Sequence, residues 1–288
     1  MTPIEFQSWL SDPARRTLVM GVLNVTPDSF SDGGRFSDPG VAIAHAREMA
    51  AAGATLIDIG GESTRPGSQP VPEAEQIRRI VPVVRALANQ IPALLSIDTT
   101  RAAVAEAALD AGAHLVNDIS GGLDDPALLP MVARRAVPVV LMHMQGTPAT
   151  MQINPTYADV VGEIKQFLRD RVSAAESVGI DPSRILIDPG IGFGKRMEHN
   201  LELLRRLAGF TSLGRPMVVG VSRKGFIGRI TGEDLPSGRR FGTAAAVAWS
   251  IANGAAIVRV HDVAPMAQVV RIIEAIQHGA AAEIPRDS

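Results

Sequence analysis

Residues 93–118, ALLSIDTTRAAVAEAALDAGAHLVND, carry the pattern that decides the fold. An apolar run over 93–97 stops at Asp98, helical spacing follows over 102–111, and Gly112 precedes the next apolar run. A glycine suits the left-handed conformation that commonly ends a helix. The stretch therefore predicts a strand, a helix and a second strand in close succession.

This unit of strand and helix repeats along the chain. The predicted strands are continuous apolar runs at 18–23, 56–59, 93–97, 115–117, 138–142, 185–187, 217–221 and 257–260. The predicted helices cover 41–52, 73–89, 102–111, 126–135, 158–178, 198–207, 243–252 and 265–278. Apolar runs without alternation are typical of parallel strands buried on both faces. Eight such units predict an α/β fold, a (β/α)8 TIM barrel, with a single domain over 1–288 and a core from about 17 to 278.

The main rival to the barrel is an open, doubly wound sheet. That fold expects a Gly-x-Gly-x-x-Gly turn after its first strand, and the sequence after Asn24 has none. In a barrel, the polar residues that end the parallel strands meet at one mouth, where barrel enzymes assemble their active sites. The sequence therefore favours a barrel with its chemistry at the strand ends.

The composition limits the class of protein and its partners. Hydrophobic residues make up 46% of the 288 residues and the net charge is only -2, which argues against disorder and against a nucleic-acid coat. The absence of cysteine excludes disulfides, thiolate zinc sites and cysteine nucleophiles. Residues 1–16 lack an apolar signal core, and no run reaches the ~18 apolar residues of a membrane span. We expect a cytoplasmic protein with small-molecule partners, no nucleic acid and no membrane.

Three predicted loops between a strand and the next helix are unusually long. They cover 26–40, 63–72 and 145–157, and they are rich in Gly, Pro, Ser and Thr. Their place at the expected catalytic end favours lids over floppy insertions. We expect the first two to be poorly ordered without ligand.

Two carboxylates and an amide follow three of the predicted strands. Asp98 and Asp188 come directly after apolar runs, and Asn117 ends the strand that follows Asp98. A carboxylate in a partly buried mouth needs a donor-rich partner, and paired N–H groups of a nitrogen heterocycle supply two parallel hydrogen bonds. The alternative is that either Asp caps the helix or turn that follows it.

A serine and a lysine follow the seventh predicted strand, where this fold often binds anions. Ser222 and Lys224, with the amides of a following helix, suit a carboxylate or a phosphate. Lys224 could instead form a Schiff base, as lysines do in barrel aldolases, or lie in a solvated basic turn.

The last predicted strand places Arg259 and His261 on one face, and barrel closure makes Asn24 their neighbour. These three residue types can hold a diphosphate, with the Asn24 oxygen available to a Mg²⁺ ion that keeps most of its waters. The alternative for Arg259 is an edge or salt-bridge residue, the commoner role of a lone Arg in a strand. His143 ends a strand but has no partner at metal-ligand spacing, so its role stays open. His45 and His199 lie in helical stretches and are expected to be surface or packing residues.

Eight segments in this order resemble the dihydropteroate synthase family, from Leu18 to Val263. They are LNVTPDSFSDGG at 23–34, DIGGESTRPG at 58–67, SIDT at 96–99, NDISGG at 117–122, HMQG at 143–146, DPGIGFGK at 188–195, GVSRK at 220–224 and RVHDV at 259–263. The resemblance implies a transferase of folate synthesis that joins 6-hydroxymethyl-7,8-dihydropterin diphosphate to 4-aminobenzoate and releases diphosphate. It also implies Mg²⁺, a homodimer and sensitivity to sulfonamides.

The resemblance also implies roles for individual residues. The pterin would be held by Asp98, Asn117, Asp188 and Lys224 in a pocket lined by Met142, Ile119 and Phe193; diphosphate and Mg²⁺ by Asn24, Arg259 and His261; and 4-aminobenzoate by Thr64, Arg65, Pro66 and Ser222, under a loop that contains Phe30. Lys224, Arg259, Asp98 and Asn24 are the residues expected to carry catalysis.

Two other functions are alternatives to this one. A methyltransferase acting between a methyl-folate and a corrinoid protein shares the pterin-binding barrel but resembles this chain less at 26–34, 63–67 and 222–224. A pterin-binding homologue without turnover is expected to lack one of the five residues Asn24, Arg65, Lys224, Arg259 and His261, and all five are present.

Overall fold

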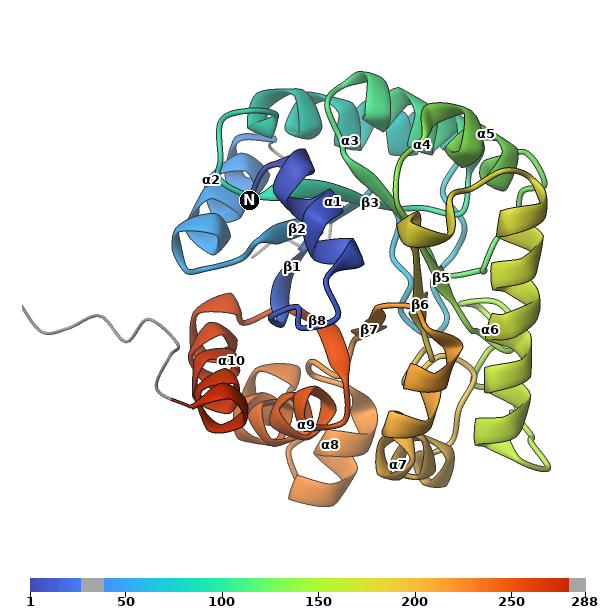
Figure 1. Cartoon of the computed structure of the whole chain (residues 1–288), viewed down its shortest axis with the longest axis vertical. Coiled ribbons are helices and arrows are strands. Elements are labelled where there is room, and N and C mark those ends of the chain that lie inside the picture. Colours follow the sequence, from blue (N-terminus) through green and yellow to red (C-terminus); the bar gives the residue numbers. More distant parts are fainter. Residues whose placement is uncertain (27–38, 280–288) are drawn as a thin grey trace, which may run out of the picture.

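The computed structural model describes residues 1–26 and 39–279, and its centre is a closed barrel of eight parallel strands (Figure 1). The strands are β1 (Leu18–Asn24), β2 (Leu56–Gly60), β3 (Leu94–Asp98), β4 (Leu115–Asp118), β5 (Val139–Met142), β6 (Ile185–Asp188), β7 (Met217–Val219) and β8 (Ala255–Val260). They follow one another around the barrel in chain order, and β8 pairs with β1 to close it. The predicted TIM barrel is confirmed.

Helices cover the barrel, with the first across one end of it and the others around the outside of the strands (Figure 1). They are α1 (Pro3–Ser11), α2 (Pro39–Ala51), α3 (Glu73–Leu87), α4 (Ala102–Asp110), α5 (Leu128–Arg135), α6 (Val160–Ser177), α7 (Met197–Arg205), α8 (Gly225–Thr231), α9 (Arg240–Ala252) and α10 (Val263–His278), with short 3-10 helices η2 (Pro182–Arg184), η3 (Leu207–Leu213) and η4 (Pro236–Arg239). Gly112, predicted to end a helix, has φ +111° and follows Ala111, the C-cap of α4.

Helix α1 was not predicted, although its start has a recognisable signal. The Thr2 side chain accepts from the Glu5 backbone N–H while the Glu5 carboxylate accepts from Thr2 N–H, which is a capping box. The buried side chains of α1 are Phe6, Trp9 and Leu10. They pack with the apolar residues inside the lower barrel, which is the half nearer the amino ends of the strands. Helix α1 therefore closes the end of the barrel opposite the strand carboxyl ends.

Side-chain alternation along the strands separates this lower core from the upper barrel. The lower interior layer includes Met20, Leu56, Leu94, Leu115, Val140, Leu186, Val218 and Ile257. Because alternate side chains on a strand share a face, the next interior position is two residues further on. Those positions hold Val22, Asp58, Ser96, Asn117, Met142, Asp188, Gly220 and Arg259. The interior thus changes from apolar to mostly polar on the way to the mouth.

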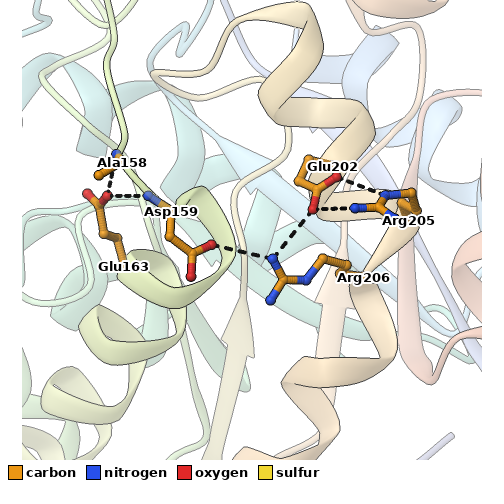
Figure 2. A network of polar contacts seen from close by, with 6 residues as sticks. All are labelled: Ala158, Asp159, Glu163, Glu202, Arg205 and Arg206. Carbon is orange, nitrogen blue, oxygen red and sulfur yellow. Dashed lines mark hydrogen bonds and ion pairs between the residues drawn. The ribbon is translucent and has the colours of Figure 1, made fainter.

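The outer helices are joined by polar contacts on the surface, such as those between α6 and α7 (Figure 2). At the start of α6, the Glu163 carboxylate accepts from the backbone N–H groups of Ala158 and Asp159. Arg206 lies 3.4 Å from both Asp159 and Glu202, and so connects the two helices. Exposed ion pairs of this kind each add only ~0.2–1 kcal/mol, so the buried apolar layers supply most of the stability.

Candidate active site

A cavity of 1570 Å³ opens at the carboxyl ends of the strands. This volume exceeds the ~300–1,000 Å³ of a pocket for one drug-sized ligand, so the cavity has room for two substrates. Its lining includes most of the predicted site residues: Asn24, Thr64, Arg65, Pro66, Asn117, Ile119, Met142, Asp188, Phe193, Ser222, Lys224, Arg259 and His261. The sequence therefore predicted which segments meet at the mouth.

The Arg259 guanidinium lies between two buried carboxylates. Its Nε donates to Asp58 Oδ2 at 2.6 Å and its Nη2 donates to Asp98 Oδ2 at 2.7 Å. Burial alone would lower the pKa of Arg259, but the two carboxylates raise it above the ordinary value. Burial also raises the pKa of Asp98 against the opposing pull of Arg259. Asp98 was predicted to face a ligand or cap a helix, and in this structure its partner is Arg259.

Asp188 and Lys224 lie in the same cavity with opposite pKa shifts. Burial raises the pKa of Asp188 to about 6, while its Oδ1 accepts from Gly190 N–H at 2.7 Å. One carboxylate oxygen of Asp188 therefore stabilises the turn that follows β6, which is the alternative role considered for this residue. Burial, and then the charge of Arg259, lower the pKa of Lys224 to about 8.

One wall of the cavity is apolar. Ile119, Met142 and Phe193 form a buried cluster with Met151, and Met142 is 3% exposed. The Lys224 Nζ lies 4.1 Å from the centroid of the Phe193 ring, a cation–π contact. An apolar wall beside Asp188 and Lys224 is suited to a flat ring with a polar edge.

Ser222 and His261 form a polar pair on the other side of the mouth. Ser222 Oγ accepts from the His261 backbone N–H at 3.2 Å and lies 3.1 Å from His261 Nδ1. Burial, and then Arg259, lower the pKa of His261 to about 3, so its ring is neutral at pH 7. Ser222 Oγ accepts from the His261 backbone, so we assign its hydroxyl O–H as the donor to Nδ1. In this tautomer the imidazole proton is on Nε2, which is left as a donor.

Lys224 is aimed by a strained turn. Arg223 has φ +59°, which is uncommon for a residue other than glycine. Its guanidinium makes two hydrogen bonds to Asp262, of 2.9 and 2.7 Å, and its backbone N–H donates to Thr243. Lys224 then occupies the N-cap of α8, a short helix that supplies the helix amides expected here but lies outside the predicted helix ranges.

The second long loop is fastened at its far end. Glu62 accepts hydrogen bonds from the Val71 backbone and from Gln76 Nε2, and Gln76 also donates to Val71 O at 2.9 Å. The loop between them carries the cavity residues Thr64, Arg65 and Pro66. Gly67 N–H donates to Pro148 O, so this loop also contacts the third long loop.

Lys195 is a buried lysine that the sequence analysis did not single out. Its Nζ lies 3.0 Å from His143 Nδ1 and 2.8 Å from Phe193 O. Burial lowers the pKa of Lys195 well below its usual range. Burial, and then Lys195, lower the pKa of His143 to about 2. His143, left open on sequence, therefore holds Lys195 in place as a neutral acceptor.

Some predictions fall outside this geometry. Phe30 and most of the first long loop lie outside the described residues, so its order is untested. His45 pairs with Glu48 and His199 packs on Tyr157, as expected of surface and packing residues. Within residues 1–26 and 39–279, no cluster of three or more His, Asp or Glu side chains could hold a metal. Among the helices of these ranges, none has the length and apolar character to cross a bilayer.

The chain is similar to proteins of known activity. The sequence pattern of the family described as "Pterin binding enzyme" matches residues 20–261. A dihydropteroate synthase of Synechocystis sp. is 47% identical over 274 residues, which are 95% of each chain. The Xanthomonas albilineans dihydropteroate synthase solved with 4-aminobenzoic acid has a TM-score of 0.86 at 46% identity, covering 91% of this chain and 94% of that one. The Yersinia pestis enzyme in a sulfonamide complex has a TM-score of 0.87 at 45% identity, with the same coverage.

Proposed function

The chain belongs to the dihydropteroate synthase family of pterin-binding enzymes, and we propose how its barrel mouth carries out the reaction. The enzyme joins 6-hydroxymethyl-7,8-dihydropterin diphosphate to 4-aminobenzoate and releases 7,8-dihydropteroate and diphosphate. The observation that supports the assignment of roles is that Asp188 from β6, Lys224 after β7 and Arg259 from β8 line one cavity. The neighbouring apolar wall supplies the surface that a flat ring needs.

Asp188 and Lys224 are proposed to bind the polar edge of the pterin. Ionised Asp188 accepts the paired N–H groups of the ring, because a carboxylate can accept two parallel hydrogen bonds. Lys224 donates to ring acceptors on the same edge. The faces of the ring then pack against Ile119, Met142 and Phe193, which form one cluster.

The cationic side of the mouth is proposed to assist the departure of diphosphate. The C–O bond of the pterin methylene breaks, and its electron pair leaves on the diphosphate oxygen. Arg259 and the neutral His261 ring stabilise the developing charge as preorganised donors. The electron-rich dihydropterin ring stabilises the cationic methylene that remains.

4-Aminobenzoate is proposed to enter beside the second loop. Its amine is neutral at pH 7, so it needs positioning and exclusion of water rather than a general base. Thr64, Arg65 and Ser222 line this part of the cavity and supply polar partners for the carboxylate. The amine nitrogen attacks the methylene and then loses a proton to solvent. Sulfonamides are proposed to compete for this place, as the Yersinia pestis complex suggests.

Magnesium is proposed to bind together with diphosphate. The described residues offer the Asn24 amide oxygen at the cavity, and Asp58 and Asp98 are already engaged by Arg259. This fits an ion held chiefly by substrate phosphates and water, with Asn24 as a protein ligand. When bound, Mg²⁺ would supply charge neutralisation on the leaving group.

Two alternatives, a Schiff base at Lys224 and a methyltransferase activity, are not favoured. Lys224 is proposed to act through charge and hydrogen bonds rather than a Schiff base, and borohydride trapping of a covalent Lys224 adduct would overturn this. A methyl-folate:corrinoid methyltransferase is not favoured, because the relatives compared above are dihydropteroate synthases.

The test of the proposed function is diphosphate release from the pterin substrate, measured with and without 4-aminobenzoate and Mg²⁺. Wild type should release diphosphate and form dihydropteroate in equal amounts. Lys224→Ala and Arg259→Ala should each lose about 100-fold or more in kcat/KM, the usual scale for one electrostatic group at a reacting centre. Lys165→Ala, on α6 and outside the cavity lining, is the matched control and should keep wild-type rates. No dihydropteroate from wild type would refute the function.

A homodimer is proposed to form through the face made by α8, η4 and α9. Large apolar side chains are exposed there: Ile230 is 56%, Leu235 70% and Phe241 88% exposed. These three side chains come from elements that contact one another, and exposed apolar surface of this kind commonly marks a protein interface. Phe241→Asp should convert a dimer to a monomer in sedimentation analysis, and a wild-type monomer would contradict the proposal. Cytoplasmic localisation stays a prediction.

A further inference from the structure

Asp58 is a buried acid that the proposed reaction leaves unexplained. It lies in the middle of β2 with 0% exposure, and it is not among the described residues that line the cavity. A charged side chain is almost never fully buried unless it is paired. What Asp58 pairs with therefore shows what it does.

Three donors converge on the Asp58 carboxylate. Ser96 Oγ donates to Oδ1 at 2.6 Å, while Asn117 Nδ2 and Arg259 Nε donate to Oδ2 at 2.8 and 2.6 Å. An ionised carboxylate is an acceptor only, so each partner must present a donor to it. Asp58 thus holds one side chain from β4 and one from β8 through the same oxygen.

This arrangement fixes the direction of the Asn117 amide. Because Nδ2 is directed to Asp58, the amide oxygen is the atom that remains for the cavity, which Asn117 lines. The two ends of an amide differ in chemistry, since the oxygen accepts and the nitrogen donates. Asn117 is therefore set to accept an N–H group from a ligand.

The same carboxylate fixes the plane of Arg259. Two of its nitrogens, Nε and Nη2, are held by Asp58 and Asp98, and these contacts span a planar group. Among the described residues, Nη1 makes no such hydrogen bond. With Asp98 alone the guanidinium would be held at one nitrogen and could turn about that bond.

We propose that Asp58 is a positioning residue that sets Asn117 as an acceptor for the pterin and Arg259 as a donor for the diphosphate. The proposal rests on the function proposed above. It assigns to one residue that touches neither ligand an influence on both halves of the substrate. A simple counter-ion for Arg259 would influence only the diphosphate half.

The experiment uses calorimetry to measure the affinity of the enzyme for each half of the substrate separately. The probes are 6-hydroxymethylpterin, which lacks diphosphate, and inorganic diphosphate with Mg²⁺. Asp58→Ala should weaken both by about tenfold or more, because a buried hydrogen bond to a charged group is lost in each half. Asp58→Asn should keep pterin affinity within about threefold, because its amide oxygen can still accept from Asn117.

Two controls separate positioning from general damage. Ser96→Ala removes the donor to Oδ1 and leaves the hydrogen bonds of Asn117 and Arg259 to Oδ2, so both affinities should stay within about threefold of wild type. In an Asn117→Ala background, adding Asp58→Ala should cause little further loss of pterin affinity, because coupled residues are not additive. A full additional loss would overturn the proposal.

The outcomes are distinguishable from failure of the proposed function. If wild type binds neither probe, the function itself fails. If wild type binds both and folded Asp58→Ala keeps either affinity within about twofold, or if Asp58→Asn loses pterin affinity as Ala does, positioning by Asp58 is refuted.

A measurement on the wild type covers the case in which Asp58→Ala does not fold. The side-chain amide signal of Asn117, identified by its loss in Asn117→Ala, should exchange with solvent far more slowly than that of exposed Asn89. Equal exchange rates would refute the proposed hydrogen bond and the positioning role with it.

Discussion

Asp188→Asn is predicted to stabilise the protein while removing its activity. Burial raises the Asp188 pKa from an ordinary value of 3.8 to about 6, so the ionised form opposes folding at neutral pH. Each pKa unit corresponds to about 1.4 kcal/mol. At a pH above both pKa values, ionised Asp188 therefore lowers the free energy of unfolding by roughly 3 kcal/mol. The amide that this substitution introduces resembles the neutral acid and can still accept from Gly190 N–H. The variant should therefore unfold with a larger free energy at pH 7.5.

The sign of the pH dependence gives a sharper test than stability at one pH. Between pH 4 and 6 the folded protein binds more protons at Asp188 than the unfolded chain does, so wild-type stability falls as the pH rises through this window. The stability advantage of Asp188→Asn should be close to zero below pH 4, grow between pH 4 and 6, and stay constant above it.

The assay is urea unfolding of both proteins from pH 4 to 8, with kcat/KM measured on the same samples. Asp262→Asn is the control with the opposite sign, because hydrogen bonds from Arg223 lower the Asp262 pKa. Asp262→Asn should have a smaller free energy of unfolding than wild type. The size of this difference should be the same at every pH between 5 and 8. The reasoning would be refuted if Asp188→Asn were less stable than wild type at pH 7.5. It would also be refuted if the difference in the free energy of unfolding between the two proteins did not change with pH.

Three further predictions concern the pH profile, the second loop and the lower core. Since Asp188 must be ionised and Lys224 protonated to bind the pterin, kcat/KM should fall below pH about 6 and above pH about 8, and a flat profile from pH 5 to 9.5 would contradict these roles. Glu62→Ala should release the second loop and raise KM for 4-aminobenzoate about tenfold, with the affinity for 6-hydroxymethylpterin unchanged in calorimetry. Trp9→Ala, at the closed end of the barrel, should cost about 3–5 kcal/mol in urea unfolding and leave kcat/KM of the folded enzyme intact.

The barrel and most of its mouth could be predicted because their signals are local. A run such as Leu115–Asp118 is apolar until it reaches the mouth and then turns polar, and Asn117 marks that point. Parallel strands in a closed barrel bring such points together whatever their separation in sequence. This is why Asn117 and Asp188 could be placed at one mouth from the sequence, whereas Asp98 contacts Arg259 and is not among the described residues that line the cavity.

The role of Asp58 could not be predicted because its partner is distant. Arg259 lies 201 residues further along the chain, and no local pattern shows that its guanidinium lies between Asp58 and Asp98. The available signal was a charge inside the apolar strand Leu56–Gly60, which required a buried partner. Arg259 was expected to hold diphosphate or to form a salt bridge, and the structure shows ion pairs to Asp58 and Asp98.

Two helices were missed for different reasons. The start of helix α1 has a recognisable capping box at Thr2 and Glu5. However, the apolar face of α1 is buried only because it packs on the end of the folded barrel. Helix α8 is seven residues long and contains Gly225 and Gly228, which are poor helix formers, so its order depends on tertiary contacts.

The most direct test of the account is a crystal structure of the enzyme with 6-hydroxymethylpterin and inorganic diphosphate. We predict that the pterin edge contacts Asp188 and Lys224 and that the diphosphate contacts Arg259 and His261, with the methylene carbon between them in the same cavity. A pterin bound away from Asp188, or a diphosphate on a different face of the barrel from the pterin, would contradict the central claim that one mouth holds both halves of the substrate.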